Sequence, residues 1–185
     1  MRVLLAKTAT AVLVAVLIAL AARVSFMLPS GAVPQSLQTV AVLGSVMLTG
    51  WVGVVGVVLY VVIGVAGLPI FADGGAGLSY ALGPSAGYLV GFCLAALWLV
   101  FAARVGMVDA FIHIFLAAIV GHIVILVAGA AGLLRWLDVF EAWQRGFAPF
   151  STGAVAKSLL LAVLVPLLRF GFRHFTDRTT ATVSD

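Results

Sequence analysis

Runs of apolar residues, each close in length to the thickness of a lipid bilayer, occupy nearly the whole of this sequence. About 20 apolar residues in a helix cross the roughly 30 Å of hydrocarbon in a membrane. Charged residues make up 9% of the 185, against about 25% in a soluble domain, and the mean hydropathy is +1.29. We therefore expect an integral membrane protein, in which the apolar runs leave too few residues for a soluble domain.

The apolar runs predict six helices separated by proline, glycine-rich or charged segments. The run 37–68 exceeds one membrane thickness and is divided near Gly50 into two shorter helices. The other four are expected over 6–28, 84–103, 110–134 and 152–170. The glycine-rich loop 68–83 is too apolar for water and should pack back onto the bundle, whereas 136–149 is a polar connection. The predicted fold is an all-α bundle of six transmembrane helices over 1–172, with a charged tail, 173–185.

Basic residues indicate how this bundle is oriented. With six spans, the basic residues before the first helix, after the fourth and after the sixth share one side: Arg2, Lys7, Arg104, Arg169, Arg173 and Arg178. The positive-inside rule makes that side cytoplasmic. Both ends of the chain are then cytoplasmic. Most acidic residues outside the tail, Asp109 excepted, lie on the outer side.

Several function classes are disfavoured by what the sequence contains. Cys93 is the sole cysteine, so no disulfide framework and no cysteine-based metal site is available. The basic residues are scattered at segment ends and form no stripe that would bind nucleic acid. No Ser-His-Asp, HExxH or paired-carboxylate arrangement occurs. We expect no enzyme, no cofactor and no metal.

Two cations lie close to the outer ends of expected helices. Lys157 falls about one and a half turns into the last helix, where an ammonium group is costly unless it faces the bundle interior, meets an anion or reaches outward to the lipid headgroups. Arg23 has the same alternatives at the end of the first helix. A ligand contact and simple snorkelling both remain open for these residues.

Neutral polar residues also lie within the expected spans. Gln38 follows the segment VPQSL, and its amide can both donate and accept hydrogen bonds, which suits a neutral polar ligand. Ser36 and Thr39 can instead cap the helix. His113 and His122 are nine residues apart, on opposite faces of one helix. They cannot share a metal, and each is expected to form an interhelical hydrogen bond, with a proton or substrate role as the alternative.

A stripe of small residues follows one face of the first helix. Ala11, Ala15 and Ala19 are spaced by four residues, a pattern that lets helices approach closely. The stripe has two interpretations: packing inside the bundle, or docking against another membrane subunit.

Four segments resemble the BioY family in order and spacing: VPQSLQTVAVL, YVVIGVAGLPIFADGGAG, GPSAGYLVGF and FAPFSTGAVAKSLLL. BioY proteins are the biotin-specific S components of energy-coupling factor (ECF) transporters. The resemblance implies a multi-pass protein of the plasma membrane that binds biotin near its outer face. It also implies a transmembrane coupling protein and ABC-type ATPase subunits as partners, with the alanine stripe contacting the coupling protein.

Site residues follow from the same resemblance. Gln38 matches the family's V-P-x-T-x-Q segment, Gly75 its glycine loop, Tyr88 its GYLxGF segment and Lys157 the lysine of its last helix. The family usually carries an acid three residues before that lysine, where this chain has Ala154. Asp73 in the loop is a possible substitute, although a plain solvated aspartate is the other interpretation.

Biotin suits a pocket made of such residues. Its apolar bicycle and valeryl chain need aromatic walls, for which the candidates are Phe71, Tyr80, Tyr88 and Trp136. Gln38 is the candidate partner of the ureido group, and Lys157 or Arg23 that of the carboxylate. An S component for another vitamin and a membrane assembly protein that binds no small molecule remain the alternatives.

Overall fold

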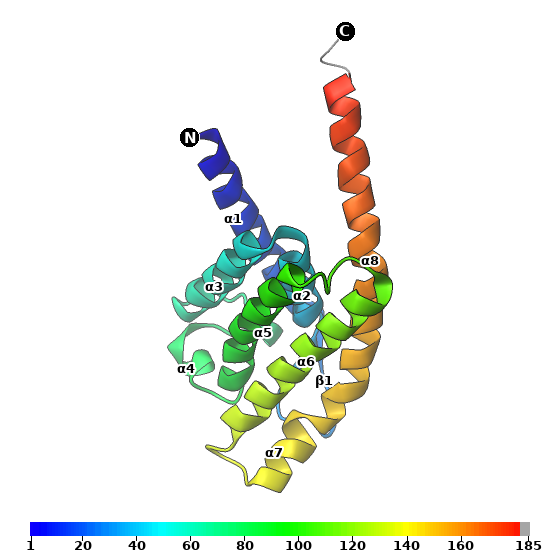
Figure 1. The fold of residues 1–185 in the computed structure, drawn as a ribbon. Coiled ribbons are helices and arrows are strands. Elements are labelled where there is room, and N and C mark those ends of the chain that lie inside the picture. The colour runs from blue at the N-terminus through cyan, green and yellow to red at the C-terminus, as the bar shows by residue number, and fades with distance from the viewer. Residues whose placement is uncertain (182–185) are drawn as a thin grey trace.

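The computed structural model describes the backbone of residues 1–181 and the side chains of residues 1–171. Helices dominate it, and they pack side by side, with the first helix starting and the last helix ending at the same end of the bundle (Figure 1). In chain order the elements are α1 (Arg2–Arg23), β1 (Ser25–Met27), β2 (Pro34–Ser36), α2 (Gln38–Thr49), α3 (Trp51–Val65), η1 (Ala72–Gly74), α4 (Gly77–Ala81), α5 (Ala86–Arg104), α6 (Phe111–Leu133), α7 (Val139–Gly146) and α8 (Ala148–Ala181).

Four helical segments are long and apolar enough to cross a membrane: Arg2–Arg23, Ala86–Arg104, Phe111–Leu133 and Val139–Gly171. α2 and α3 are shorter apolar helices. At a rise of 1.5 Å per residue, they measure only about 18 and 22 Å. They meet at Gly50, whose φ of 60° is a conformation that glycine adopts without strain. The break predicted at this glycine is confirmed.

The structure is mostly helical, as predicted, but it also contains a short two-stranded hairpin that was not expected. α1 ends at Arg23 instead of continuing to residue 28, and residues 25–36 form an antiparallel hairpin. Phe26 pairs with Gln35, and Met27 pairs with Pro34 at the end of the ladder. Proline has no backbone N–H, and at this terminal position the ladder does not need one. The hairpin satisfies backbone groups at a point where the chain reverses direction.

The connection 136–149 contains a helix that was not expected. Asp138 caps α7, because its carboxylate accepts a hydrogen bond of 2.8 Å from the backbone N–H of Glu141. An acid three residues after an N-cap residue is a recognised start signal for a helix. α7 continues almost directly into α8, which is why the last helix begins at Ala148 and not at residue 152.

The glycine-rich loop packs back onto the bundle, as predicted. Phe71 is fully buried, and its ring occupies the space that a side chain at Gly64 of α3 would take. η1 and α4 follow, so that the loop is partly helical.

Close helix contacts are made through small residues. Gly56 of α3 faces Val14 and the backbone of Ala11 on α1, at a distance that leaves no room for a side chain. Ala11 and Ala15 are buried and Ala19 is half-buried. The structure therefore places the predicted docking stripe largely inside the bundle, which was the alternative interpretation, and Ala11 and Ala15 are not available to another subunit in this arrangement.

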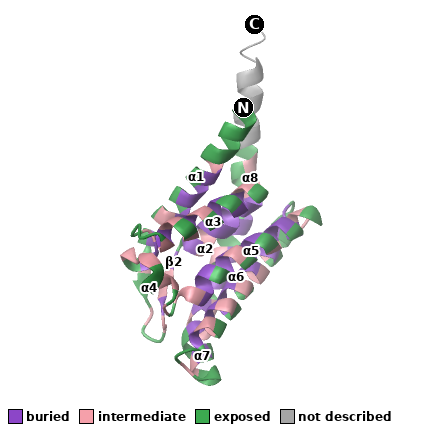
Figure 2. Ribbon diagram, turned by 90° about the vertical axis from the view of Figure 1, so that its left-hand side faces the viewer, coloured by how far each residue is buried: buried purple, intermediate pink, exposed green. Residues whose placement is uncertain are grey.

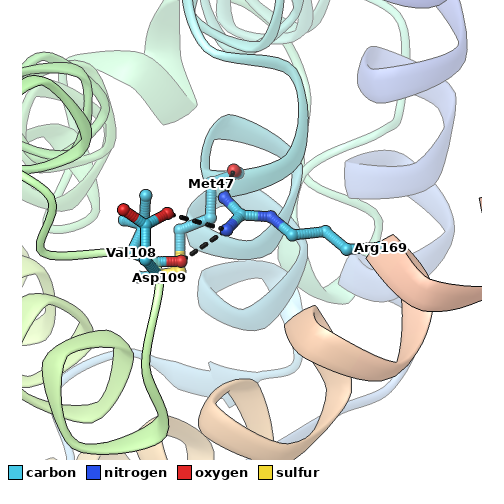
Figure 3. A network of polar contacts seen from close by, with 4 residues as sticks. All are labelled: Met47, Val108, Asp109 and Arg169. Atoms are coloured by element: carbon cyan, nitrogen blue, oxygen red, sulfur yellow. Dashed lines mark hydrogen bonds and ion pairs between the residues drawn. The ribbon is translucent and has the colours of Figure 1, made fainter. Parts of the chain in front are cut away.

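Figure 2 shows exposed residues along all the long helices. Many of them are large apolar residues, as a lipid-facing surface requires. Basic groups close the end of the bundle where α1 starts and α8 ends. Arg169 of α8 donates hydrogen bonds to the carbonyls of Val108 and, at 2.7 Å, Met47, and its guanidinium lies 3.5 Å from Asp109 (Figure 3). Arg104 lies over the ring of Trp51 nearby. These contacts join α8 to the end of α2 and to the loop before α6.

Candidate functional site

A cavity of about 70 Å³ lies at the other end of the bundle, among the hairpin, the start of α2, the glycine-rich loop, α5, α6 and α8. Aliphatic and aromatic side chains form much of its wall: Val33, Phe71, Leu89, Phe92, Ile125, Leu126 and Phe150. Side chains that can form hydrogen bonds interrupt this wall: Gln35, Ser36, Gln38, Thr39, Tyr80, Ser85, Tyr88, His122 and Lys157. An apolar enclosure with a few polar groups is the usual form of a small-molecule site.

Lys157 supplies the cation of the cavity. Its ammonium group donates a hydrogen bond of 2.6 Å to the backbone carbonyl of Ser36 in β2. Because α8 begins at Ala148, Lys157 lies about two and a half turns into the helix and not one and a half. The side chain is half-buried and lines the cavity, where it reaches the hairpin.

Gln38 is held by a chain of hydrogen bonds behind the cavity wall. Its side-chain carbonyl accepts a bond of 2.8 Å from the hydroxyl of Ser36, and its amide nitrogen donates to the hydroxyl of Tyr60. Tyr60 in turn donates to the carbonyl of Ile70, 3.1 Å away in the glycine-rich loop. Gln38 is 4% exposed, and the network fixes its amide while joining α2 to α3 and the loop.

His122 forms the interhelical hydrogen bonds that were expected. Its Nε2 lies 3.1 Å from the hydroxyl of Thr39 on α2, and its Nδ1 lies 2.9 Å from the hydroxyl of Ser158 on α8. The imidazole therefore joins three helices at the base of the cavity. His113 is exposed on α6, and the side chains described here give it no such interhelical bond.

Aromatic rings form two sides of the cavity. Phe71 stacks on Tyr80 with ring centroids 5.0 Å apart, and Gly75 leaves the space that the Tyr80 ring fills. Burial raises the pKa of the Tyr80 hydroxyl; a hydrogen bond with the Ser85 side chain lowers it in part, and the charge of Asp73 raises it, so the group stays neutral. Across the cavity, Tyr88 lies edge to face with Phe150 and donates to the carbonyl of Gly146 at 2.6 Å.

Some predicted site residues lie outside the cavity wall. Asp73 is exposed and has a left-handed backbone conformation, φ 54°, and it is not among the residues that line the cavity with Ala154. Gly75 supports Tyr80 from behind. Trp136 is exposed and contacts Arg135. Arg23 is also exposed and does not line the cavity. Its guanidinium donates to the carbonyl of Pro69 at 2.6 Å and so joins α1 to the glycine-rich loop.

Several wall residues were not predicted. Gln35 lies beside Gly153 at the hairpin, and Phe150 lies in the first turn of α8. Phe92, Ile125 and Leu126 come from apolar stretches with nothing to distinguish them from lipid-facing positions. Only Gln35 carried a signal, as a polar residue three positions before Gln38. Among the described residues, no group of three or more His, Cys, Asp or Glu side chains is placed to hold a metal ion.

Apolar helices with a partly polar cavity at one end define a polytopic membrane protein with a candidate small-molecule site. The same fold is found in the crystal structure of "the S-component for biotin from an ECF-type ABC transporter", with a TM-score of 0.81 and 20% identity, over 91% of this chain and 93% of that one.

The sequence comparisons give the family. The BioY family model matches residues 1–174, and the chain belongs to the BioY family. It is 34% identical to the probable biotin transporter BioY of Lysinibacillus sphaericus over 87% of this chain and 85% of that protein. It is 30% identical to biotin transporter BioY2 of Lactococcus lactis subsp. cremoris over 81% of this chain and 86% of that protein. These relatives are transporters and not enzymes, and the chain is an integral membrane protein.

Proposed function

We propose that this chain is the biotin-binding membrane subunit of an ECF-type vitamin uptake system. Membership of the BioY family and the names of its relatives support the ligand. The observation that carries the proposal is a cavity in which one ammonium group, that of Lys157, and several neutral hydrogen-bonding groups interrupt an apolar, aromatic wall. Biotin has the matching parts: an apolar bicycle and chain, a neutral ureido group and one carboxylate.

The proposed orientation places the cavity at the outer face of the plasma membrane. In support, Arg104 and Arg169 lie at the end of the bundle away from the cavity, on the side that the positive-inside rule makes cytoplasmic. In this arrangement α2 and α3 complete six membrane helices, although each is shorter than the hydrocarbon core. Biotin enters from outside.

Transport requires partners, for which we propose a transmembrane coupling protein and ABC-type ATPase subunits. The chain has no glycine-rich phosphate-binding motif of the GxxxxGK type, so it brings no recognisable nucleotide site of its own. The similar crystal structure belongs to an ECF-type ABC transporter. Since Ala11 and Ala15 are buried, a coupling protein docks on other exposed positions of the bundle or displaces α1.

Biotin binding by the purified chain tests the proposal. In detergent or nanodiscs, isothermal titration should give a saturable biotin site. Lys157→Ala should weaken it about tenfold or more, because a hydrogen bond to a charged group contributes about 1.5–3 kcal/mol. Lys7→Ala is the matched control. Lys7 lies near the start of α1, at the end of the bundle away from the cavity, and its variant should bind as the wild type does.

A thermal-shift screen of vitamins separates the alternatives. Stabilisation by biotin alone supports the proposal. Stabilisation by another vitamin and not by biotin indicates an S component of different specificity, for which the apolar Ala154 in the cavity wall is the structural basis. No shift with any vitamin favours a membrane assembly protein.

A further inference from the structure

The hydrogen-bonding groups of the cavity differ in whether they already have partners. Gln38 is bonded to Ser36 and Tyr60, Thr39 to His122, and Tyr88 to the carbonyl of Gly146. The same holds for His122 and for Lys157. These groups form the frame of the cavity, and a ligand that used them fully would have to displace a protein partner.

Gln35 is the exception in this set. Its side chain lines the cavity and is half-buried, and in the described part of the chain its amide forms no hydrogen bond. Only its backbone is fixed, by pairing of β2 with Phe26 in β1. A half-buried amide next to an apolar wall has one acceptor and two donor positions to satisfy.

Gly153 leaves the space that this amide occupies. A side chain at Gly153 would overlap the Gln35 amide nitrogen, so the absence of one is what lets the amide lie against the first turns of α8. The next residue, Ala154, adds no polar atom to this part of the wall. The Gln35 amide is therefore the side-chain group without a protein partner on the wall that α8 shares with the hairpin.

A carboxamide is complementary to one particular kind of ligand group. Its carbonyl accepts from an N–H while its NH₂ donates to a neighbouring carbonyl, which matches the N–H and C=O of a cyclic urea. It carries no charge, so it gives no preference for a cation or an anion.

We infer that Gln35 is a specificity-determining residue that pairs its amide with the ureido N–H and C=O of the ligand. This inference rests on the proposed function, because the ureido group is that of biotin. A glutamate at position 35 keeps the shape and the acceptor, loses the donor and adds a negative charge. It should shift the preference from the neutral urea to a cationic guanidine.

The experiment compares biotin with 2-iminobiotin, in which the urea is replaced by a guanidine that is protonated at neutral pH. Titrations use the wild type, Gln35→Leu, Gln35→Glu and, as matched control, Gln144→Leu, an exposed position on α7. Gln35→Leu should weaken biotin about tenfold, since about two hydrogen bonds are lost. Gln35→Glu should raise the ratio of iminobiotin to biotin affinity by about tenfold or more, because it pairs opposite charges in a partly buried site. The control should change neither affinity.

The outcomes separate this inference from the proposed function. A wild type that fails to bind biotin overturns both. A wild type that binds biotin, with the iminobiotin-to-biotin ratio unchanged in Gln35→Glu, overturns the role of Gln35 alone. An equal loss of both ligands in Gln35→Glu also overturns it, because a merely structural residue would give that result. Gly153→Ala should reproduce the biotin loss of Gln35→Leu by displacing the amide.

Discussion

The hydroxyl of Tyr60 lies behind the cavity wall, where it serves two partners at once. It accepts from the amide of Gln38 and donates to the carbonyl of Ile70, and the tyrosine itself is fully buried. Loss of this single oxygen would leave an amide N–H and a loop carbonyl unsatisfied in an apolar environment. Tyr60 does not line the cavity itself, and we expect it to position the Gln38 amide that forms part of the cavity frame.

Tyr60→Phe should therefore weaken biotin binding about tenfold and lower the free energy of unfolding by about 1–3 kcal/mol. Titration and thermal denaturation in the same detergent measure the two effects. Combining Tyr60→Phe with Gln38→Leu tests the mechanism, because the effects of substitutions within one hydrogen-bond network are not additive. A double variant whose two losses simply sum would contradict the proposed link.

Arg169 has a comparable role at the opposite end of the bundle. Its planar guanidinium reaches the carbonyls of Met47 and Val108 together, a geometry that a lysine cannot reproduce. The nearby Asp109 carboxylate is 73% exposed, and such ion pairs contribute little.

Arg169→Lys should accordingly destabilise the protein by about 1–2 kcal/mol, because the carbonyls of Met47 and Val108 lose the guanidinium that donates to both. Asp109→Asn should leave the melting temperature nearly unchanged. The reverse order of effects, seen by thermal denaturation, would show that the ion pair and not the carbonyl contacts fixes this end.

The contact between α5 and α6 is the most extensive helix pairing in the structure, and it depends on glycines. A side chain at Gly91 would come within 2.9 Å of the Ile125 backbone, and one at Gly132 would come within 2.8 Å of Gly87. Small residues at such positions let two backbones approach closely within a membrane, where no hydrophobic force drives helices together.

Gly91→Ala should lower the free energy of unfolding by about 1–3 kcal/mol, the usual cost of overpacking a tight contact. Gly171→Ala in α8 is the matched control, because nothing lies within 4 Å of that position. It should be neutral or slightly stabilising, as alanine is the better helix former. Equal effects of both substitutions on the melting temperature would argue against close packing as the cause.

At the scale of elements, the sequence predicts the helices that are set by the lengths of the apolar runs. Their lengths reflect the thickness of the bilayer, so the long helices and the break at Gly50 were predictable. The hairpin 25–36 and α7 lie where that constraint ends. Lys157 could be identified because a cation in lipid is costly, whereas Phe92 and Ile125 look like any lipid-facing residue until packing turns them inward.

The whole molecule has two dissimilar ends. One carries Arg104, Arg169, the start of α1 and the end of α8, and the other carries the cavity, α4 and α7 (Figure 1). The family resemblance gave the ligand class, but an amide such as that of Gln35 became a candidate only when the hairpin brought it against α8. Contacts between segments more than a hundred residues apart leave no local pattern.

The proposed orientation can be measured with single cysteines in a Cys93→Ala background. Leu78→Cys on α4 and Phe140→Cys on α7, both exposed, should react with a membrane-impermeant maleimide added outside intact cells. Leu4→Cys, exposed at the start of α1, should react only after permeabilisation. Labelling of Leu4→Cys alone in intact cells would reverse the proposed orientation.

The start of α1 and the end of α8 project away from the cavity, and this separation makes the molecule easy to tether. A tag at either end can anchor a nanodisc to a sensor surface with the binding face turned to the flowing solution. All immobilised copies then present equivalent sites, so association and dissociation rates can be followed directly. Because the cavity and the tagged helix ends lie at opposite ends of the bundle, the same arrangement gives a uniformly oriented biosensor layer.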